Sequence, residues 1–192
     1  MARTNLSIDR AVFEEFAAEA DRRKMTLFAF ANESLSAITK ISQEGGNPDE
    51  FHRIWRVLEI LREVDVITLP SDFVEELIQR LYKSNPEVIR TKFRELGTSI
   101  VGLLKMVAED VEDLTPLAKD FAFFVPVKHF ELRRVKDGIV QVDVVGAGKA
   151  IETTECSAEF LKAILAGYSY VVTKSEIHPG TMRLRAERTG RS

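Results

Sequence analysis

Close to its N-terminus the chain contains the stretch Asn5-Leu6-Ser7-Ile8-Asp9, in which polar and apolar side chains alternate. Alternation with a period of two is typical of a short, half-buried β-strand, because successive side chains of a strand point to opposite faces. Asp9 is well placed to cap a following helix, since its carboxylate can accept a hydrogen bond from a backbone N–H of the first turn. The stretch therefore predicts one strand that leads directly into a helix.

Two amphipathic helices are predicted after this strand. The first spans about residues 10–23, and Thr26 is expected to cap the second, which ends near Ile41. Apolar residues recur at three- and four-residue spacing in both helices, which predicts a buried stripe on each. The stripe residues are Val12, Phe13, Phe16, Ala17 and Ala20 in the first helix and Leu27, Phe30, Ala31, Leu35 and Ile38 in the second.

One strand and two helices are too little to form a stable domain alone. A unit of about 45 residues has a small core, and a lone strand has no partner for its backbone groups. A second copy of the chain would supply both the missing strand and the rest of the core. We therefore expect a homodimer or a higher homo-oligomer.

Residues 2–44 resemble the ribbon-helix-helix family of DNA-binding proteins, the Arc, MetJ and CopG type. The resemblance rests on Arg3-Thr4-Asn5-Leu6-Ser7-Ile8-Asp9, on Arg22-Arg23-Lys24-Met25-Thr26, and on the helix that follows each segment. In that family two chains pair their strands into an antiparallel ribbon that enters the major groove of DNA. The resemblance implies a dimer that binds double-stranded DNA and regulates transcription.

The resemblance also assigns roles to single residues. Thr4, Leu6 and Ile8 would face the dimer core, whereas Arg3, Asn5 and Ser7 would face the bases. Arg can bond to guanine O6 and N7, Asn to adenine N6 and N7, and Ser to either base. Thr26 would lie where the family binds a phosphate, at the N-terminus of the second helix.

The chain departs from the family pattern at two positions. The loop before the second helix usually holds a Gly where this chain has Lys24, and the first turn is usually polar where this chain has Leu27-Phe28-Ala29-Phe30. A large exposed apolar group is unfavourable at a DNA-facing helix start, so Phe28 is expected to be covered by a partner domain or subunit. A unit that only dimerises the protein is the alternative interpretation.

The rest of the chain is expected to form a linker helix within residues 45–69 and an α/β domain over residues 70–192. Three strands are predicted at 123–127, 130–135 and 139–145, and Lys136-Asp137-Gly138 is expected to join the last two as a hairpin turn. A helix capped by Ser157 and strands at 168–174 and 181–187 complete an antiparallel sheet. The expected fold class is α+β, with a dimeric ribbon-helix-helix unit before this domain.

Residues 71–188 are faintly similar to domains of the 4-vinyl-reductase type, which bind small molecules. The likeness rests on Tyr82 with Phe93-Arg94-Glu95-Leu96-Gly97, and on the segment 160–167 before Tyr170-Val171-Val172. It implies a small apolar ligand held between helices and sheet, so the domain is expected to sense an effector or to oligomerise. The cysteines that such domains often carry are missing, which leaves a metal site unsupported.

Other motifs are weak. The segment Val142 to Lys149 imitates a dinucleotide-binding turn but lacks the third glycine, so a loop that needs Gly for its backbone is the better interpretation. The three histidines lie on separate elements, and Cys156 has no nucleophile motif around it. The arginines Arg183, Arg185, Arg188 and Arg191 are interpreted as a solvated strand edge and tail. We expect no cofactor, no metal and no enzymatic activity.

The composition limits both the size of any DNA-binding surface and the expected cellular compartment. A net charge of −3 over 192 residues implies that any DNA-binding surface is small and local, since broad DNA-binding faces are usually basic. A single cysteine favours a reducing compartment, and no apolar stretch is long enough to span a bilayer, so a cytoplasmic protein without membrane contact is expected. The leading hypothesis is a dimeric transcriptional regulator. The alternatives are a dimeric scaffold without DNA binding and, in third place, a small-molecule-modifying enzyme dimerised by the ribbon.

Overall fold

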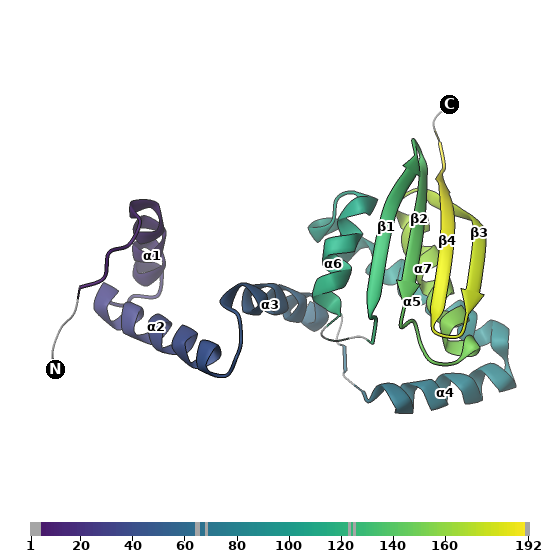
Figure 1. Ribbon diagram of the computed structural model, residues 1–192, viewed down its shortest axis with the longest axis horizontal. Helices are drawn as coiled ribbons and strands as arrows, with labels where there is room; N and C mark the ends of the chain where they lie inside the picture. The colour runs from purple at the N-terminus through teal and green to yellow at the C-terminus, as the bar shows by residue number, and fades with distance from the viewer. Residues whose placement is uncertain (1–4, 64–65, 68, 123, 125, 191–192) are drawn as a thin grey trace. The chain divides into compact units, whose positions relative to one another are not determined.

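The computed structural model describes residues 5–63, 66–67, 69–122, 124 and 126–190. In this part of the chain, seven α-helices and a short 3₁₀ helix accompany a four-stranded antiparallel sheet (Figure 1). The chain divides into two compact units, Met1–His52 and Arg53–Ser192. The mixed α+β class with an antiparallel sheet is therefore confirmed.

The N-terminal unit consists mainly of helices α1 (Arg10–Arg22) and α2 (Leu27–Gln43). Asp9 caps α1 by accepting from the backbone N–H of Ala11, and Thr26 caps α2 by accepting from that of Ala29. Both caps and both helices agree with the sequence predictions. The capping side chains satisfy backbone donors that the first helical turn leaves free.

The prediction of a strand at residues 5–8 was wrong for the single chain, because Asn5 to Asp9 form no strand there. A strand exists by its inter-strand hydrogen bonds, and the described part of the N-terminal unit holds no second strand that could supply them. The segment lies exposed ahead of α1.

Four further helices precede the sheet: α3 (Pro48–Glu63), α4 (Ser71–Ser84), α5 (Pro86–Val107) and α6 (Leu114–Phe121). Asn85 caps α5 and Pro86 occupies its first turn, as predicted. Helix α6 was not predicted, and it follows the 3₁₀ helix Val111–Asp113. Of the strand predicted at 123–127, residues 124, 126 and 127 lie outside any strand and the other two lie outside the described residues.

The sheet has the strand order β1-β2-β4-β3, with all neighbours antiparallel. The strands are β1 (His129–Lys136), β2 (Ile139–Val145), β3 (Tyr170–His178) and β4 (Thr181–Arg188). Helix α7 (Ile151–Gly167) connects β2 to β3 and packs with α5 against one face of the sheet (Figure 1). Strand β4 is central, so the interpretation of its arginines as a strand edge was wrong; Arg191 lies outside the described residues.

The core of the second unit lies between the sheet and its helices. Side chains of β2 and β4 alternate between buried and more exposed, as expected for a sheet with one covered face. Gly97 of α5 allows close contact with α7, because a Cβ there would lie 2.4 Å from the carbonyl oxygen of Phe160. The most buried core side chains are Val140, Val142, Ala158, Leu165, Leu184 and Ala186.

Helix α7 begins six residues before the predicted cap Ser157, directly after the loop that contains Gly146 and Gly148. Its N-cap, Ala150, has no capping side chain. Glu75 of α4 instead fixes the segment around this end of the helix, since its carboxylate accepts from the backbone N–H of Lys149, just before the N-cap, at 2.5 Å and from Thr153 Oγ1 at 2.9 Å. A contact supplied by a distant helix leaves no local signal in the sequence.

Within the described helices, none is long and apolar enough to cross a membrane.

Candidate functional site

The segment before α1 holds two of the predicted DNA-contacting residues. Asn5 and Ser7 are exposed, and Arg3 lies outside the described residues. Leu6 and Ile8 alternate with them and are 66% and 49% exposed, which is unusual for aliphatic side chains next to a helix N-terminus. The single chain thus presents polar and apolar groups of this segment to solvent alike.

Helices α1 and α2 form only part of a core. Ala20 and Phe30 are buried, and the rings of Phe16 and Phe30 stack with their centroids 4.4 Å apart. The other large residues of the two predicted stripes are exposed in the single chain. They are Val12, Phe13, Leu27, Leu35 and Ile38.

The loop between α1 and α2 has the geometry that favours glycine. Lys24 has φ +56°, the backbone N–H of Lys24 donates to Asp21, and that of Met25 donates to Ala20. This is the Schellman arrangement, in which the residue after the helix adopts a left-handed conformation. A left-handed conformation favours Gly, so Lys24 occupies this position with a conformational cost.

Thr26 lies at the start of α2, where the resemblance implied a phosphate contact. Its hydroxyl accepts from Ala29 N at 3.2 Å. Phe28, in the same first turn, is 66% exposed in the single chain. The predicted cover of Phe28 by a partner subunit or domain stays a prediction.

The arginines near α1 are paired with acidic residues of the same helix. Arg10 lies 2.9 Å from Glu14, and Glu19 accepts from both Arg22 and Arg23, at 2.7 and 2.6 Å. The hydrogen bond from Arg22, followed by that from Arg23, lowers the pKa of Glu19 to about 2. These ion pairs reduce the positive charge that the unit can offer to phosphate groups.

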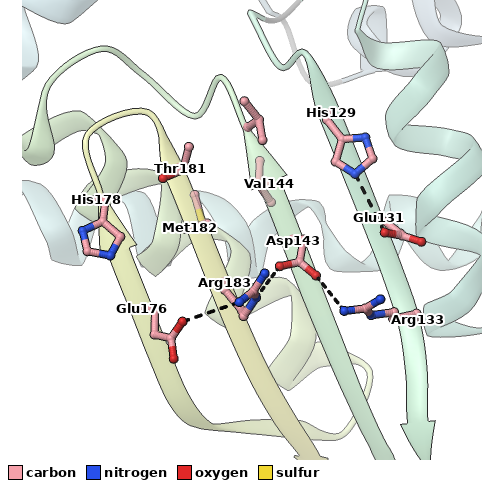
Figure 2. Close-up of a pocket in the computed structure, with 11 residues that line it drawn as sticks. His129, Glu131, Arg133, Asp143, Val144, Glu176, His178, Thr181, Met182 and Arg183 are labelled. Atoms are coloured by element: carbon pink, nitrogen blue, oxygen red, sulfur yellow. Dashed lines mark hydrogen bonds and ion pairs between the residues drawn. The ribbon is translucent and has the colours of Figure 1, made fainter.

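The second unit has a charged hollow on the face of the sheet opposite α5 and α7. The hollow has a volume of about 520 Å³. It lies over one end of the sheet, where β1 and β4 begin and β2 and β3 end (Figure 2). Glu131, Asp143, Arg183 and Glu176 share one row across the four strands. Sequence reasoning missed this row, although Glu131, Asp143 and Arg183 each lie between two apolar residues of their strand.

Ion pairs connect the row across the strands. Asp143 accepts from Arg183 at 2.6 Å and lies 3.7 Å from Arg133, while Arg183 lies 3.8 Å from Glu176 (Figure 2). Burial of the Asp143 carboxylate raises its pKa. Hydrogen bonds from Gln141 and Arg183 outweigh this effect, so the pKa of Asp143 lies below its ordinary value. Because acidic and basic groups compensate one another, the hollow has no strong preference for a phosphate or for a metal cation.

The loop that imitates a dinucleotide site is already occupied by a carboxylate. Gly148 has φ +108°, and a Cβ there would lie within 3.0 Å of both Thr153 and Glu75. The Glu75 carboxylate takes the place near the α7 N-terminus that a pyrophosphate would need. The structure thus supports the interpretation that these glycines serve the backbone.

The remaining candidate groups are dispersed or inert. No group of three or more His, Cys, Asp or Glu side chains in the described part of the chain could hold a metal ion. Cys156 is fully buried, and desolvation raises its pKa to about 11. Since the thiolate is the reactive form, this thiol is a poor nucleophile at neutral pH.

Comparison with known proteins adds no family, because no family model matches the chain and no curated protein is significantly similar to it.

Proposed function

We propose that the protein is a cytoplasmic, sequence-specific DNA-binding transcriptional regulator that acts as a dimer through its N-terminal unit. The observation that carries the proposal is the incomplete core of that unit in the single chain. Leu6, Ile8 and five large stripe residues of α1 and α2 (Val12, Phe13, Leu27, Leu35 and Ile38) remain exposed, and burial of such side chains is the main driving force for association. A second copy that pairs its residues 5–8 with those of the first would cover them.

In such a ribbon the side chains alternate between the core and the DNA. With Leu6 and Ile8 in the dimer core, Asn5 and Ser7 would face the major groove together with Arg3. Thr26 would add a phosphate contact at the α2 N-terminus. Because these groups are few and local, the proposal is compatible with a chain of net charge −3.

The second unit is proposed to sense an effector or to oligomerise the regulator. Its core and its sheet are complete within one chain, so it needs no partner to fold. A small apolar ligand between helices and sheet remains a proposal carried by the resemblance alone. The charged hollow on the other face would suit a polar ligand instead.

Adjacent residues with opposite roles provide the test. Arg3→Ala and Asn5→Ala should weaken binding to the preferred duplex by about 1–3 kcal/mol with little change in stability, because they remove base contacts. Leu6→Ala and Ile8→Ala should instead destabilise the dimer by about 2–5 kcal/mol, and lose DNA binding only as a consequence. Duplex titrations after operator selection, at several salt concentrations, together with thermal melts on the same variants, measure both effects.

A dimeric scaffold without DNA binding is the second candidate. It is favoured by the ion pairs that Glu14 and Glu19 form with the arginines of α1, since these leave little free positive charge on the unit. A parent protein that binds no duplex even at low salt would support the scaffold and exclude the regulator, because phosphate contacts are strongest at low ionic strength.

A further inference from the structure

Helix α4 has apolar side chains on two sides, and its own unit covers only one of them. Ile78 is buried and Val74 is half-buried. Phe73, Leu77 and Leu81 are 51%, 41% and 54% exposed. Because residues four apart lie above one another on a helix, these three form a single stripe, the α4 stripe.

Polar contacts fix which side of α4 faces its unit. Glu75 accepts from the backbone N–H of Lys149, just before α7. Tyr82 donates to Glu155 of α7, and Glu155 also binds Arg90 of α5. Glu75, Ile78 and Tyr82 lie on one side of the helix, and the α4 stripe lies away from them. Rotation of α4 that would bury the stripe against α5 and α7 would break these contacts, so the stripe is available to a partner.

The charges beside the stripe are segregated along the helix. Asp72 and Glu76 occupy its first half, and Arg80 and Lys83 its second half. All four are exposed and lie on the same flank of the stripe, by the helical spacing of their positions. Within one chain Arg80 pairs with Glu76, and Lys149 pairs with Asp72. Among the side chains of α4 itself, the flank carries its acidic groups toward one end and its basic groups toward the other.

We propose that the α4 stripe is a self-association surface on which α4 of a second copy packs in antiparallel orientation. A two-fold axis near Leu77 places Phe73 opposite Leu81 of the second copy and Leu77 opposite itself, as an isologous contact requires. The same operation brings Glu76 toward Arg80, and Asp72 toward Lys83, of the second copy. In a parallel pair the charged flanks of the two copies would lie on opposite sides of the interface, so these pairs could not form.

This surface is separate from the N-terminal dimer and does not rest on DNA binding. The experiments therefore use the full chain with Leu6→Asp, which puts a charge into the proposed ribbon core and leaves α4 as the remaining contact. Self-association of this protein at high concentration is expected in sedimentation equilibrium. A strictly monomeric protein would overturn the proposal while leaving the regulator function untouched.

Cross-linking tests the two-fold axis. Cys156, the only cysteine, is buried, so an introduced surface thiol would react alone. Leu77→Cys should form a covalent dimer under mild oxidation, because the axis brings the two introduced thiols together. Leu96→Cys on α5, at a position with a similar exposure of 52%, is the matched control and should not. If Leu77→Cys cross-links no more than Leu96→Cys, the proposal is overturned. That result is expected if another protein or the chain's own N-terminal unit covers the stripe.

Charge reversal tests the orientation. Glu76→Arg or Arg80→Glu alone should raise the dissociation constant of the α4 contact by roughly 5- to 10-fold, because each change places like charges together at two symmetric points. The double variant Glu76→Arg with Arg80→Glu restores both pairs and should associate like the parent. If the single variants also associate like the parent, the antiparallel arrangement is wrong.

Discussion

The two units of the chain bury their apolar side chains to different extents. In the second unit, residues such as Val140, Leu165 and Leu184 are inaccessible to solvent within a single chain. In the N-terminal unit only Ala20 is inaccessible among the described residues and Phe30 is 7% exposed, although two full apolar stripes were predicted there. From this difference we expect the second unit to fold alone and the N-terminal unit to depend on association.

Thermal melts should separate the units and give the largest effect. Association stabilises by mass action, so the transition of the N-terminal unit should move to higher temperature as the protein concentration rises, and that of the second unit should not. Leu184→Ala should destabilise the second unit by about 2–5 kcal/mol, because it opens a cavity in a complete core. Leu35→Ala should lower only the temperature of the concentration-dependent transition of the N-terminal unit.

Differential scanning calorimetry over a hundredfold range of concentration would measure this. Two transitions that are both independent of concentration would contradict the comparison, since the N-terminal unit would then be complete within one chain.

A smaller effect is expected at two non-glycine residues with positive φ, one in each unit. Lys24 has φ +56° and Ser169 has φ +65°, each just after a helix. Replacement by Gly removes a conformational cost of roughly 1–2 kcal/mol but adds about 0.4–1 kcal/mol of entropy to the unfolded chain. Lys24→Gly should therefore slightly raise the temperature of the concentration-dependent transition of the N-terminal unit. Ser169→Gly should slightly raise the transition temperature of the second unit.

Alanine at the same positions is the control, because a left-handed backbone costs free energy for Ala as it does for Lys or Ser. If Ala and Gly raise the transition temperature equally, loss of the original side chain, and not the backbone conformation, explains the stabilisation.

The smallest effect concerns acid stability of the N-terminal unit. The pKa of Glu19 is lowered from 4.5 to about 2 by Arg22 and Arg23. A lowered pKa in the folded state means that the ion pairs stabilise the unit above pH 4.5 and that this contribution is lost as the pH falls toward 2. Glu19→Gln should remove this part of the pH dependence in melts between pH 5 and 2, whereas Glu15→Gln, whose exposed carboxylate has no ion pair among the described residues, should keep it.

Local signals in the sequence predicted much of the fold. Asp9, Thr26 and Asn85 cap helices as expected, and the turn at residues 136–138 joins β1 to β2. These features depend on neighbouring residues, which a single sequence displays directly.

The errors have non-local causes. Helix α7 begins before Ser157, and the segment at its start is bound by Glu75, 74 residues away from Lys149. The strand at residues 5–8 requires hydrogen bonds from another strand, so alternation alone does not form it within one chain. The charged row on the sheet joins strands whose order cannot be inferred from their spacing. Of the candidate site, Asn5, Ser7 and Thr26 are placed at the surface, and their contact with DNA stays a prediction.

The contact of Glu75 with Lys149 and Thr153 also has a consequence for how the second unit assembles. The contact joins segments that are far apart in the chain, so its closure is entropically costly and is expected late in folding. Until α4 docks, the segment that leads into α7 lacks this contact and should open readily. The backbone amide of Lys149 would then exchange its hydrogen with solvent much faster in a Glu75→Ala chain than in the parent. That one amide would report whether α4 is docked.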